Sequence, residues 1–434
     1  MSDEAGGRGA AGEARRLLRP LRDEILALAR ALVRVDSVSS PPRGREAQAQ
    51  KVLARALKGH RLDVELYDTA FLARSRHAYV RRDRDYRGRP NLVVRLAGTG
   101  RGRSLLLSGH VDTVPPGRTR WRDNPWSGVV RRGRLYGRGS WDMKGGLAAQ
   151  CAVAIALKKA GARPGGDLLV ESVVDEEFAG GGGTLAARLR GVTADACAIA
   201  EPTNEEVLRA SRGGHFFDLV CRAGDASAYF SKEEVLSPAV PVGRLLGWID
   251  RWAAKRRDVE RGEAYRGFPD PAPVQVLALE ANRLEPDVPW SVPLEARVRV
   301  YFQFLPHEDA RAAAEGIEAS LRTFCDADPF FHAHPVEVRR LVDPPLEGHE
   351  LPADHPWTRC LHASARAVLG ERAPLTASEW PCDAFLNQKH FGIPTLLFGP
   401  RGAGAHNADE HVVVASLLHT AEVYLAAALE WCGA

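Results

Sequence analysis

Short apolar runs alternate with amphipathic stretches along most of the chain. Runs rich in Leu, Val and Ile predict buried strands at 62–67, 91–96, 105–107, 168–174, 196–200 and 395–398. Apolar residues at helical spacing predict helices over 14–35, 45–57, 143–160, 357–369 and 412–431, and residues 1–12 are expected to be disordered. Strands that alternate with helices are typical of an α/β fold. We therefore predict a mostly parallel sheet with helices on both faces.

The pattern changes between residues 211 and 324. Long strands are predicted at 216–222, 274–279 and 294–304, and helices at 240–254 and 307–323. This arrangement indicates an inserted α+β domain with one sheet. Because 434 residues exceed one ordinary core, we predict two domains. The larger comprises 1–210 and 325–434, and the smaller is the insert 211–324.

Charge and composition narrow the classes of partner. The formal net charge is +4, and the basic residues are interleaved with acids, so we expect no nucleic-acid partner. No segment approaches the roughly 18 apolar residues of a membrane helix, and the N-terminal stretch lacks the apolar core of a signal peptide. The seven cysteines contain no CxxC pair, which argues against a thiolate zinc site. We expect a cytoplasmic protein with reduced thiols.

Polar side chains follow several predicted strands directly. His110 and Asp112 follow 105–107, the pair Glu176-Glu177 follows 168–174, and Glu201 follows 196–200. The carboxyl ends of parallel strands form the edge where α/β sheets bind ligands. Asp142 opens the helix 143–160, and His406 lies in a Gly-rich loop after 395–398; each has an ordinary explanation alone, such as helix capping. Together these imidazole and carboxylate groups suggest a cation site.

Five motifs occur in a defined order along the chain: SGHVDTVP, GRGSWDMKGG, VDEEFAGGGGT, AEPT and GPRGAGAHNADEHV. In this order the sequence resembles the two-zinc metallopeptidase and deacylase family that includes acetylornithine deacetylase, succinyl-diaminopimelate desuccinylase, aminoacylase and glutamate carboxypeptidase. The motifs cover both halves of the larger predicted domain.

The resemblance implies a site that holds two divalent metal ions, with zinc expected and cobalt or manganese as alternatives. Asp142 would bridge the two ions. Glu177 and His406 would complete one metal site, and His110 and Glu201 the other. The resemblance further implies that Asp112 orients His110, that Glu176 is the general base, that the Asp142–Met143 peptide bond is cis, and that Asp383 lies near the site.

The expected activity is hydrolysis of an amide bond by a metal-activated water. The substrate would be a small amide or peptide, cleaved by an N-acyl amino acid deacylase or a small-peptide carboxypeptidase or dipeptidase. The insert 211–324 would act as a lid and would allow a homodimer to form.

Two features of the family are missing or moved in the insert. A histidine is expected near Ala228, where the sequence has none, and His215 is the nearest substitute. A carboxylate-binding arginine is expected near Gln303, with Arg297 and Arg299 out of register.

Two alternatives remain open, and the departures in the insert favour only the first. The first is a non-catalytic metal-binding or interaction protein that retains the fold. The second is a metallohydrolase for phosphate esters, for which Arg118, Arg120 and Arg122 would supply the positive charge.

Overall fold

The computed structural model describes residues 2–222, 237–281 and 295–433. The chain divides into two compact units. Unit 1 comprises Met1–Ala210, Glu350–Ser378 and Cys382–Ala434, and unit 2 comprises Ser211–His349 and Glu379–Pro381. Unit 2 extends beyond the predicted boundary at residue 324 because β15 (Glu337–Arg340) pairs with β12 (Gly213–Arg222).

An eight-stranded sheet with the order β17-β10-β18-β9-β5-β8-β4-β3 forms the centre of unit 1. Its strands are β3 (Val64–Asp68), β4 (Pro90–Leu96), β5 (Leu105–His110), β8 (Leu168–Val173), β9 (Cys197–Ile199), β10 (Val207–Leu208), β17 (Leu375–Thr376) and β18 (Thr395–Leu397). The central strands β18, β9, β5 and β8 run parallel, whereas β4 pairs antiparallel with β8 and β3. The carboxyl ends of β5, β8 and β9 therefore meet at one edge, as predicted.

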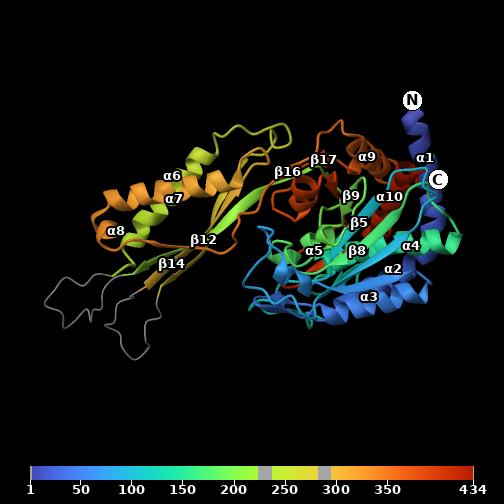
Figure 1. The fold of residues 1–434 in the computed structure, drawn as a ribbon, viewed down its shortest axis with the longest axis horizontal. Coiled ribbons are helices and arrows are strands. Elements are labelled where there is room, and N and C mark those ends of the chain that lie inside the picture. The colour runs from blue at the N-terminus through green and yellow to red at the C-terminus, as the bar shows by residue number, and fades with distance from the viewer. Residues whose placement is uncertain (1, 223–236, 282–294, 434) are drawn as a thin grey trace. The chain divides into compact units, whose positions relative to one another are not determined.

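Helices cover the central strands of unit 1. They are α1 (Ser2–Leu18), α2 (Arg22–Val33), α3 (Ala47–Gly59), α4 (Gly145–Ala160), α5 (Thr184–Leu189), α9 (Pro356–Leu369) and α10 (Val414–Cys432). Every residue of β5 and β8 is buried, which requires cover on both faces of the sheet. The apolar helices α4 and α10 contact β5 and each other (Figure 1). The structure thus confirms the mostly parallel α/β fold.

The N-terminal region differs from the prediction. A helix, α1, occupies the stretch that we expected to be disordered, and its residues Ala11, Ala14 and Leu18 are buried. Helix α1 packs along α10 and also contacts α9. Pro20 lies in a short 3₁₀ turn, Arg19–Leu21, so the single helix predicted over 14–35 becomes α1 and α2.

A smaller antiparallel sheet of unit 1 connects two segments that carry candidate ligands. Its order is β19-β20-β7-β6, with β6 (Val129–Arg131), β7 (Arg134–Tyr136), β19 (Gly402–Ala403) and β20 (His411–Val413). The turn between β19 and β20 contains His406 in a left-handed conformation, with φ 61°. Strand β7 leads into the turn Ser140–Lys144, which contains Asp142. The pairing of β20 with β7 thus brings the two segments together.

The remaining short strands are β1 (Ser39–Ser40), β2 (Arg43–Gly44), β11 (Ala210–Ser211) and β16 (His349–Glu350).

Unit 2 contains an antiparallel sheet with the order β13-β14-β12-β15. Its other elements are β13 (Val274–Ala281), β14 (Glu295–Phe304), α6 (Pro241–Arg256), α7 (Ala310–Ala327) and α8 (Pro329–Ala333). Helices α6 and α7 lie along the sheet (Figure 1), and the core between them includes Phe217, Trp248, Phe302 and Ile317. None of the helices in 2–222, 237–281 or 295–433 has the length and apolar character that a membrane crossing needs.

Candidate metal centre

The backbone places the predicted site residues at one edge of the main sheet of unit 1. His110 is the last residue of β5, Glu176 follows β8, and Glu201 lies two residues after β9. Asp142 lies just before α4, in a turn where its φ and ψ of −113° and 95° depart from helical values. The peptide bond between Asp142 and Met143 is cis, as the family resemblance implied.

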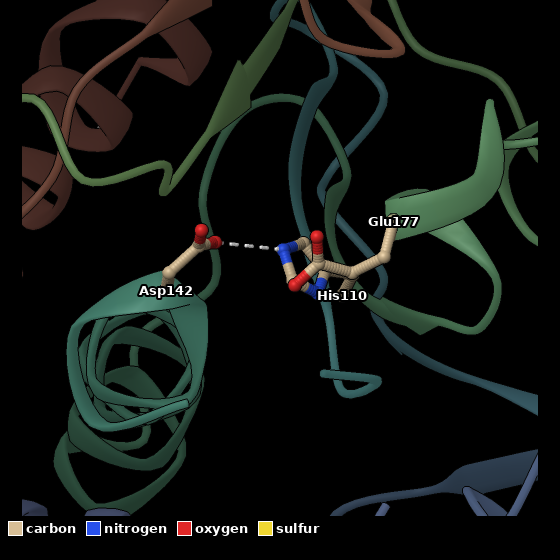
Figure 2. Close-up of side chains that lie close together, drawn as sticks. All are labelled: His110, Asp142 and Glu177. Carbon is tan, nitrogen blue, oxygen red and sulfur yellow. Dashed lines mark hydrogen bonds and ion pairs between the residues drawn. The ribbon is translucent and has the colours of Figure 1, made fainter. Parts of the chain in front are cut away.

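The Asp142 carboxylate lies between two imidazole rings. Asp142 Oδ1 is 3.2 Å from His110 Nε2, and Asp142 Oδ2 is 3.2 Å from His406 Nε2. Figure 2 shows Asp142, His110 and Glu177 pointing toward one another from three separate elements. A carboxylate with one oxygen toward each ring has the geometry that a ligand shared by two cations requires.

The other acids surround this centre. His406 Nε2 is 3.0 Å from Glu177 Oε2, and His110 Nε2 is 3.8 Å from Glu201 Oε1. Ligand atoms of His110, Asp142 and Glu177 lie within 4.8 Å of one another, and so do those of His110, Glu176 and Glu201. The structure therefore brings together all five predicted ligands and the predicted base.

The charges of the site favour a bound cation. Burial and the negative charges of Glu201 and Asp383 hold the pKa of Glu176 well above its usual value. Burial likewise raises the pKa of Glu201, and its buried Oε1 atom has no hydrogen-bond partner among the described residues. Buried acids that repel one another are costly unless a positive charge offsets them. Imidazole and carboxylate donors suit zinc and similar divalent ions, so these residues fit a metal centre.

His406 and Asp142 shift the pKa of each other. Burial would lower the pKa of His406, but Glu177 and Asp142 raise it to about 11. Burial would raise the pKa of Asp142, but hydrogen bonds from His110 and His406 hold it below its usual value. The rings thus act as positive partners of the acids in the protein itself.

Asp112 contacts both His110 and the acidic pair. His110 Nδ1 lies 3.0 Å from the Asp112 backbone oxygen and 3.5 Å from Asp112 Oδ1. The Asp112 carboxylate accepts hydrogen bonds from the backbone N–H groups of Glu176 at 3.2 Å and Glu177 at 3.3 Å. Asp112 is fully buried, so it can fix the orientation of the ring and of the turn that follows β8.

Asp383 lies beside Glu176. The Asp383 backbone N–H donates to Glu176 Oε1 at 3.3 Å, and the Thr184 hydroxyl donates to the Asp383 carboxylate. Burial raises the pKa of Asp383 to about 6. Its position agrees with the implied location near the site.

A buried ionic cluster beneath the site has no counterpart in our sequence interpretation. Asp175 precedes the acidic pair in a left-handed conformation, with φ 65°. Its carboxylate accepts from Arg84 and Arg89, and Arg89 also pairs with Glu46. The alternating basic and acidic residues of 81–87 are typical of a solvated loop, but Arg84 is buried. A left-handed conformation is unfavourable for a residue other than glycine, and these ion pairs stabilise it at Asp175. The contacts join residues far apart in the sequence, so no local pattern identified the cluster.

The unit 2 residues at which the sequence differs from the family pattern are held by identifiable contacts. Gln303 is buried, and its side-chain oxygen accepts from Arg212 at 3.1 Å. Arg299 pairs with Asp218 at 2.8 Å. His215 is fully buried, and its ring centroid is 4.3 Å from that of Phe217. The position near Ala228 lies outside the described residues.

The comparisons with known proteins agree with this geometry. Residues 106–430 match the profile of "Peptidase family M20/M25/M40". A succinyl-diaminopimelate desuccinylase of Gluconacetobacter diazotrophicus is 29% identical over 419 residues, covering 94% of this chain and 97% of the relative.

Solved structures share the fold. Human carnosine dipeptidase 1 superposes with a TM-score of 0.73 at 15% identity, covering 98% of this chain and all of that one. A Bacillus subtilis protein described as a dinuclear metal binding peptidase, YXEP, gives a TM-score of 0.59 at 14% identity, covering 95% and 99% of the two chains. The chain therefore belongs to peptidase family M20/M25/M40 and is a hydrolase of amide bonds.

Proposed function

We propose that the centre binds two divalent metal ions, zinc in the first place and cobalt or manganese as alternatives, and that it hydrolyses the amide bond of an N-acyl amino acid or a small peptide. The observation that carries this proposal is the Asp142 carboxylate, which lies 3.2 Å from the ring nitrogens of both His110 and His406. Asp142 would be shared by the two ions. His406 and Glu177 would hold one ion, and His110 and Glu201 the other.

The residues of the centre would have different roles in hydrolysis. Divalent ions at this centre would polarise the substrate carbonyl and make a nearby water more acidic. Glu176 adjoins the ligands but is not needed as one, so it accepts the proton of the attacking water and returns it to the departing amine. Asp112 holds the His110 ring and the turn at Glu176 and Glu177. The products are a free carboxylic acid and a free amine.

The names of the relatives support the proposed substrate class. The desuccinylase named above and the dipeptidase neighbour bear names that describe amide or peptide hydrolysis. A small amide that carries an amino acid part fits both. Because the named relatives are enzymes, the alternative of a non-catalytic protein is not supported.

The proposal is tested by replacing the base and a ligand with the same isosteric change. Glu176→Gln should keep both metal ions and lose most of the turnover on a panel of N-acyl amino acids and dipeptides, by about 10²–10⁴-fold. Glu177→Gln should instead lose metal. Metal content by mass spectrometry and turnover are measured on the same preparations. If Glu176→Gln turns over as fast as the parent, or if the metal-loaded parent cleaves nothing in the panel, the proposal fails.

We further propose that residues 211–324 act as a lid and allow a homodimer to form. Strand β13 is at the edge of the unit 2 sheet, and none of the described residues pairs with its outer side. Val276, Leu277 and Leu279 on this strand are 45%, 50% and 54% exposed. An apolar edge strand of this kind is suited to pairing with another chain.

Sedimentation velocity tests the dimer. The parent should sediment as a dimer, and the double variant Leu277→Lys with Leu279→Lys should sediment as a monomer. Val240→Lys is the matched control, because Val240 is an exposed apolar residue of the same unit outside β13. A monomeric parent, or a double variant that remains dimeric, would contradict the dimer.

A further inference from the structure

Glu410 is a fully buried acid that the proposed mechanism does not use. It lies four residues after His406, immediately before β20, and its partner Arg138 is also buried. Arg138 Nη1 donates to Glu410 Oε2 at 2.6 Å. A buried ion pair needs further hydrogen bonds to offset the loss of hydration, and here those bonds come from the backbone next to Asp142.

Three backbone N–H groups donate to the Glu410 carboxylate. Gly139 N donates to Oε2 at 3.0 Å, and Trp141 N donates to Oε1 at 2.9 Å. Asp142 N donates to the same Oε1 at 3.1 Å. Both carboxylate oxygens thus bind the segment 138–142 from a position some 270 residues later in the chain.

These N–H groups need an acceptor because the chain is not helical here. Asp142 and Met143 have φ and ψ values outside the helical range, so the backbone ladder of α4 cannot extend back through them. Buried N–H groups without an acceptor are costly. The Glu410 carboxylate supplies the acceptors, and a charged acceptor forms the stronger kind of hydrogen bond.

The same residue also connects the two segments that hold the centre. Gly137 N donates to the Glu410 backbone oxygen at 3.0 Å, so side chain and backbone of Glu410 bind the same stretch. The Trp141 indole N–H donates to the Pro400 backbone oxygen at 2.8 Å, which adds a second link. The segments of Asp142 and His406 are therefore held to each other before any metal binds.

We propose that Glu410 is a positioning residue of the metal centre: its carboxylate fixes the backbone of Asp142 relative to His406, and so sets the affinity for the ion that both residues bind. This inference rests on the proposed function for the identity of the ligands, but the backbone contacts exist without metal. Outer partners of metal ligands typically change metal affinity 10–100-fold when they are replaced.

The test uses Glu410→Gln in the full chain. The amide side chain has one oxygen in place of two, so it cannot accept all of the hydrogen bonds. In the metal-free protein, hydrogen exchange of peptides covering 137–144 should become at least about 10-fold faster. Zinc affinity, measured by competition with a chromophoric chelator, should fall about 10–100-fold. The absorption spectrum of the cobalt-substituted protein should change, because the geometry of Asp142 at the metal changes.

Glu171→Gln is the matched control. Glu171 is likewise a buried acid, and it pairs with Arg188 and accepts from the Ser108 hydroxyl. Within the described part of the chain, no backbone N–H of a ligand segment donates to its carboxylate. It should lower the melting temperature to a similar degree and leave the exchange of 137–144 and the zinc affinity unchanged. If Glu410→Gln does not fold, Glu410→Asp replaces it in the test. The aspartate keeps the charge but is one methylene shorter, so the increase in hydrogen exchange and the loss of zinc affinity should be smaller.

Each possible result either supports or overturns the proposal. Unchanged exchange or unchanged zinc affinity in the Glu410 variants would overturn it, and so would an equal loss of affinity in Glu171→Gln. If the parent itself binds no metal while exchange at 137–144 depends on Glu410, the proposed function fails and the positioning of the Asp142 backbone stands.

Discussion

At the scale of single residues, Glu201 illustrates how a buried acid depends on a bound cation. Its side chain is only 5% exposed, and its Oε1 atom has no hydrogen-bond partner in the described part of the chain. A buried charge of this kind is stabilised by a cation and is costly without one. The residue therefore stabilises the metal-loaded protein and destabilises the metal-free protein.

Glu201→Gln tests this dependence in both states. The neutral amide should reduce the retained metal from about two ions per chain to about one, measured by mass spectrometry after gel filtration. In the metal-free protein the same change should raise the melting temperature, because the raised pKa of Glu201 destabilises the folded state at neutral pH and the amide lacks this effect. Retention of two ions, or a lower melting temperature in the metal-free variant, would contradict the assignment of Glu201.

His215 predicts a pH dependence of stability in unit 2. Burial lowers the pKa of His215 to about 4, whereas an unfolded histidine has a pKa of about 6.5. Between these values the unfolded chain binds more protons than the folded chain, so stability falls as the pH falls from 6.5 to 4. The loss should reach about 2–3 kcal/mol at pH 4. The substitution His215→Leu should remove this loss of stability at low pH.

Urea denaturation of the parent and His215→Leu at pH 7 and pH 5 measures the effect. The variant should gain about 1–2 kcal/mol relative to the parent on going to pH 5. An equal pH dependence of the two proteins would show that the pKa of His215 in the folded state is close to its unfolded value.

The sequence predicted individual site residues where local pattern and family motif coincided. His110 and Glu201 follow apolar runs that the structure confirms as β5 and β9. Glu410 and Arg84 were missed because their function depends on contacts with Asp142 and Asp175, which lie far away in the sequence. A side chain that caps a distant backbone segment leaves no local periodicity by which it can be recognised.

At the scale of elements, the position of α4 determines the distance between two candidate ligands. Asp142 lies just before this helix, and Gly146 in its first turn lies against the backbone that precedes Glu201. A Cβ atom on Gly146 would be 2.3 Å from the Ala200 backbone oxygen. Only glycine allows α4 to come this close to the end of β9.

Gly146→Ala should therefore move the start of α4 away from β9. We expect a loss of about 1–3 kcal/mol in the free energy of unfolding from overpacking, together with weaker zinc binding. Gly161→Ala at the other end of α4 is the control, because Gly161 has φ 65° with no atom near its Cβ position. It should cost about 1 kcal/mol and leave zinc binding unchanged. Equal zinc affinities in the two variants would contradict this coupling.

Element boundaries were predicted best where the apolar pattern was long. The predicted helix 143–160 corresponds to α4, and 412–431 corresponds to α10. The N-terminal stretch was mispredicted because its residues are mostly small and polar. Ala11 in this stretch is buried, and α1 packs against α10 and α9. Tertiary packing of this kind is not visible in a hydropathy pattern.

At the scale of the whole molecule, the proposed ligands belong to unit 1 alone. Residues 110, 142, 177, 201 and 406 all fall within its ranges, and none falls in 211–349. A ligand that binds only the folded form stabilises it by mass action, by about 2.7 kcal/mol for each site at a free concentration 100 times Kd. Metal should thus stabilise one unit of the chain directly.

Removal of metal by a chelator should therefore affect the two units differently. Hydrogen exchange of the intact chain should become faster in the peptides that contain His110, Asp142 and His406, because the buried acids there lose the cation that offsets their repulsion. Peptides from β12 and β14 of unit 2 should keep their protection. Adding zinc, cobalt or manganese back should restore protection in unit 1 together with activity, and the ion that restores both at the lowest free concentration is the preferred one. If chelation increased hydrogen exchange in unit 2 as much as in unit 1, the metal would be stabilising the whole chain. A metal centre confined to the edge of the unit 1 sheet would then be the wrong description.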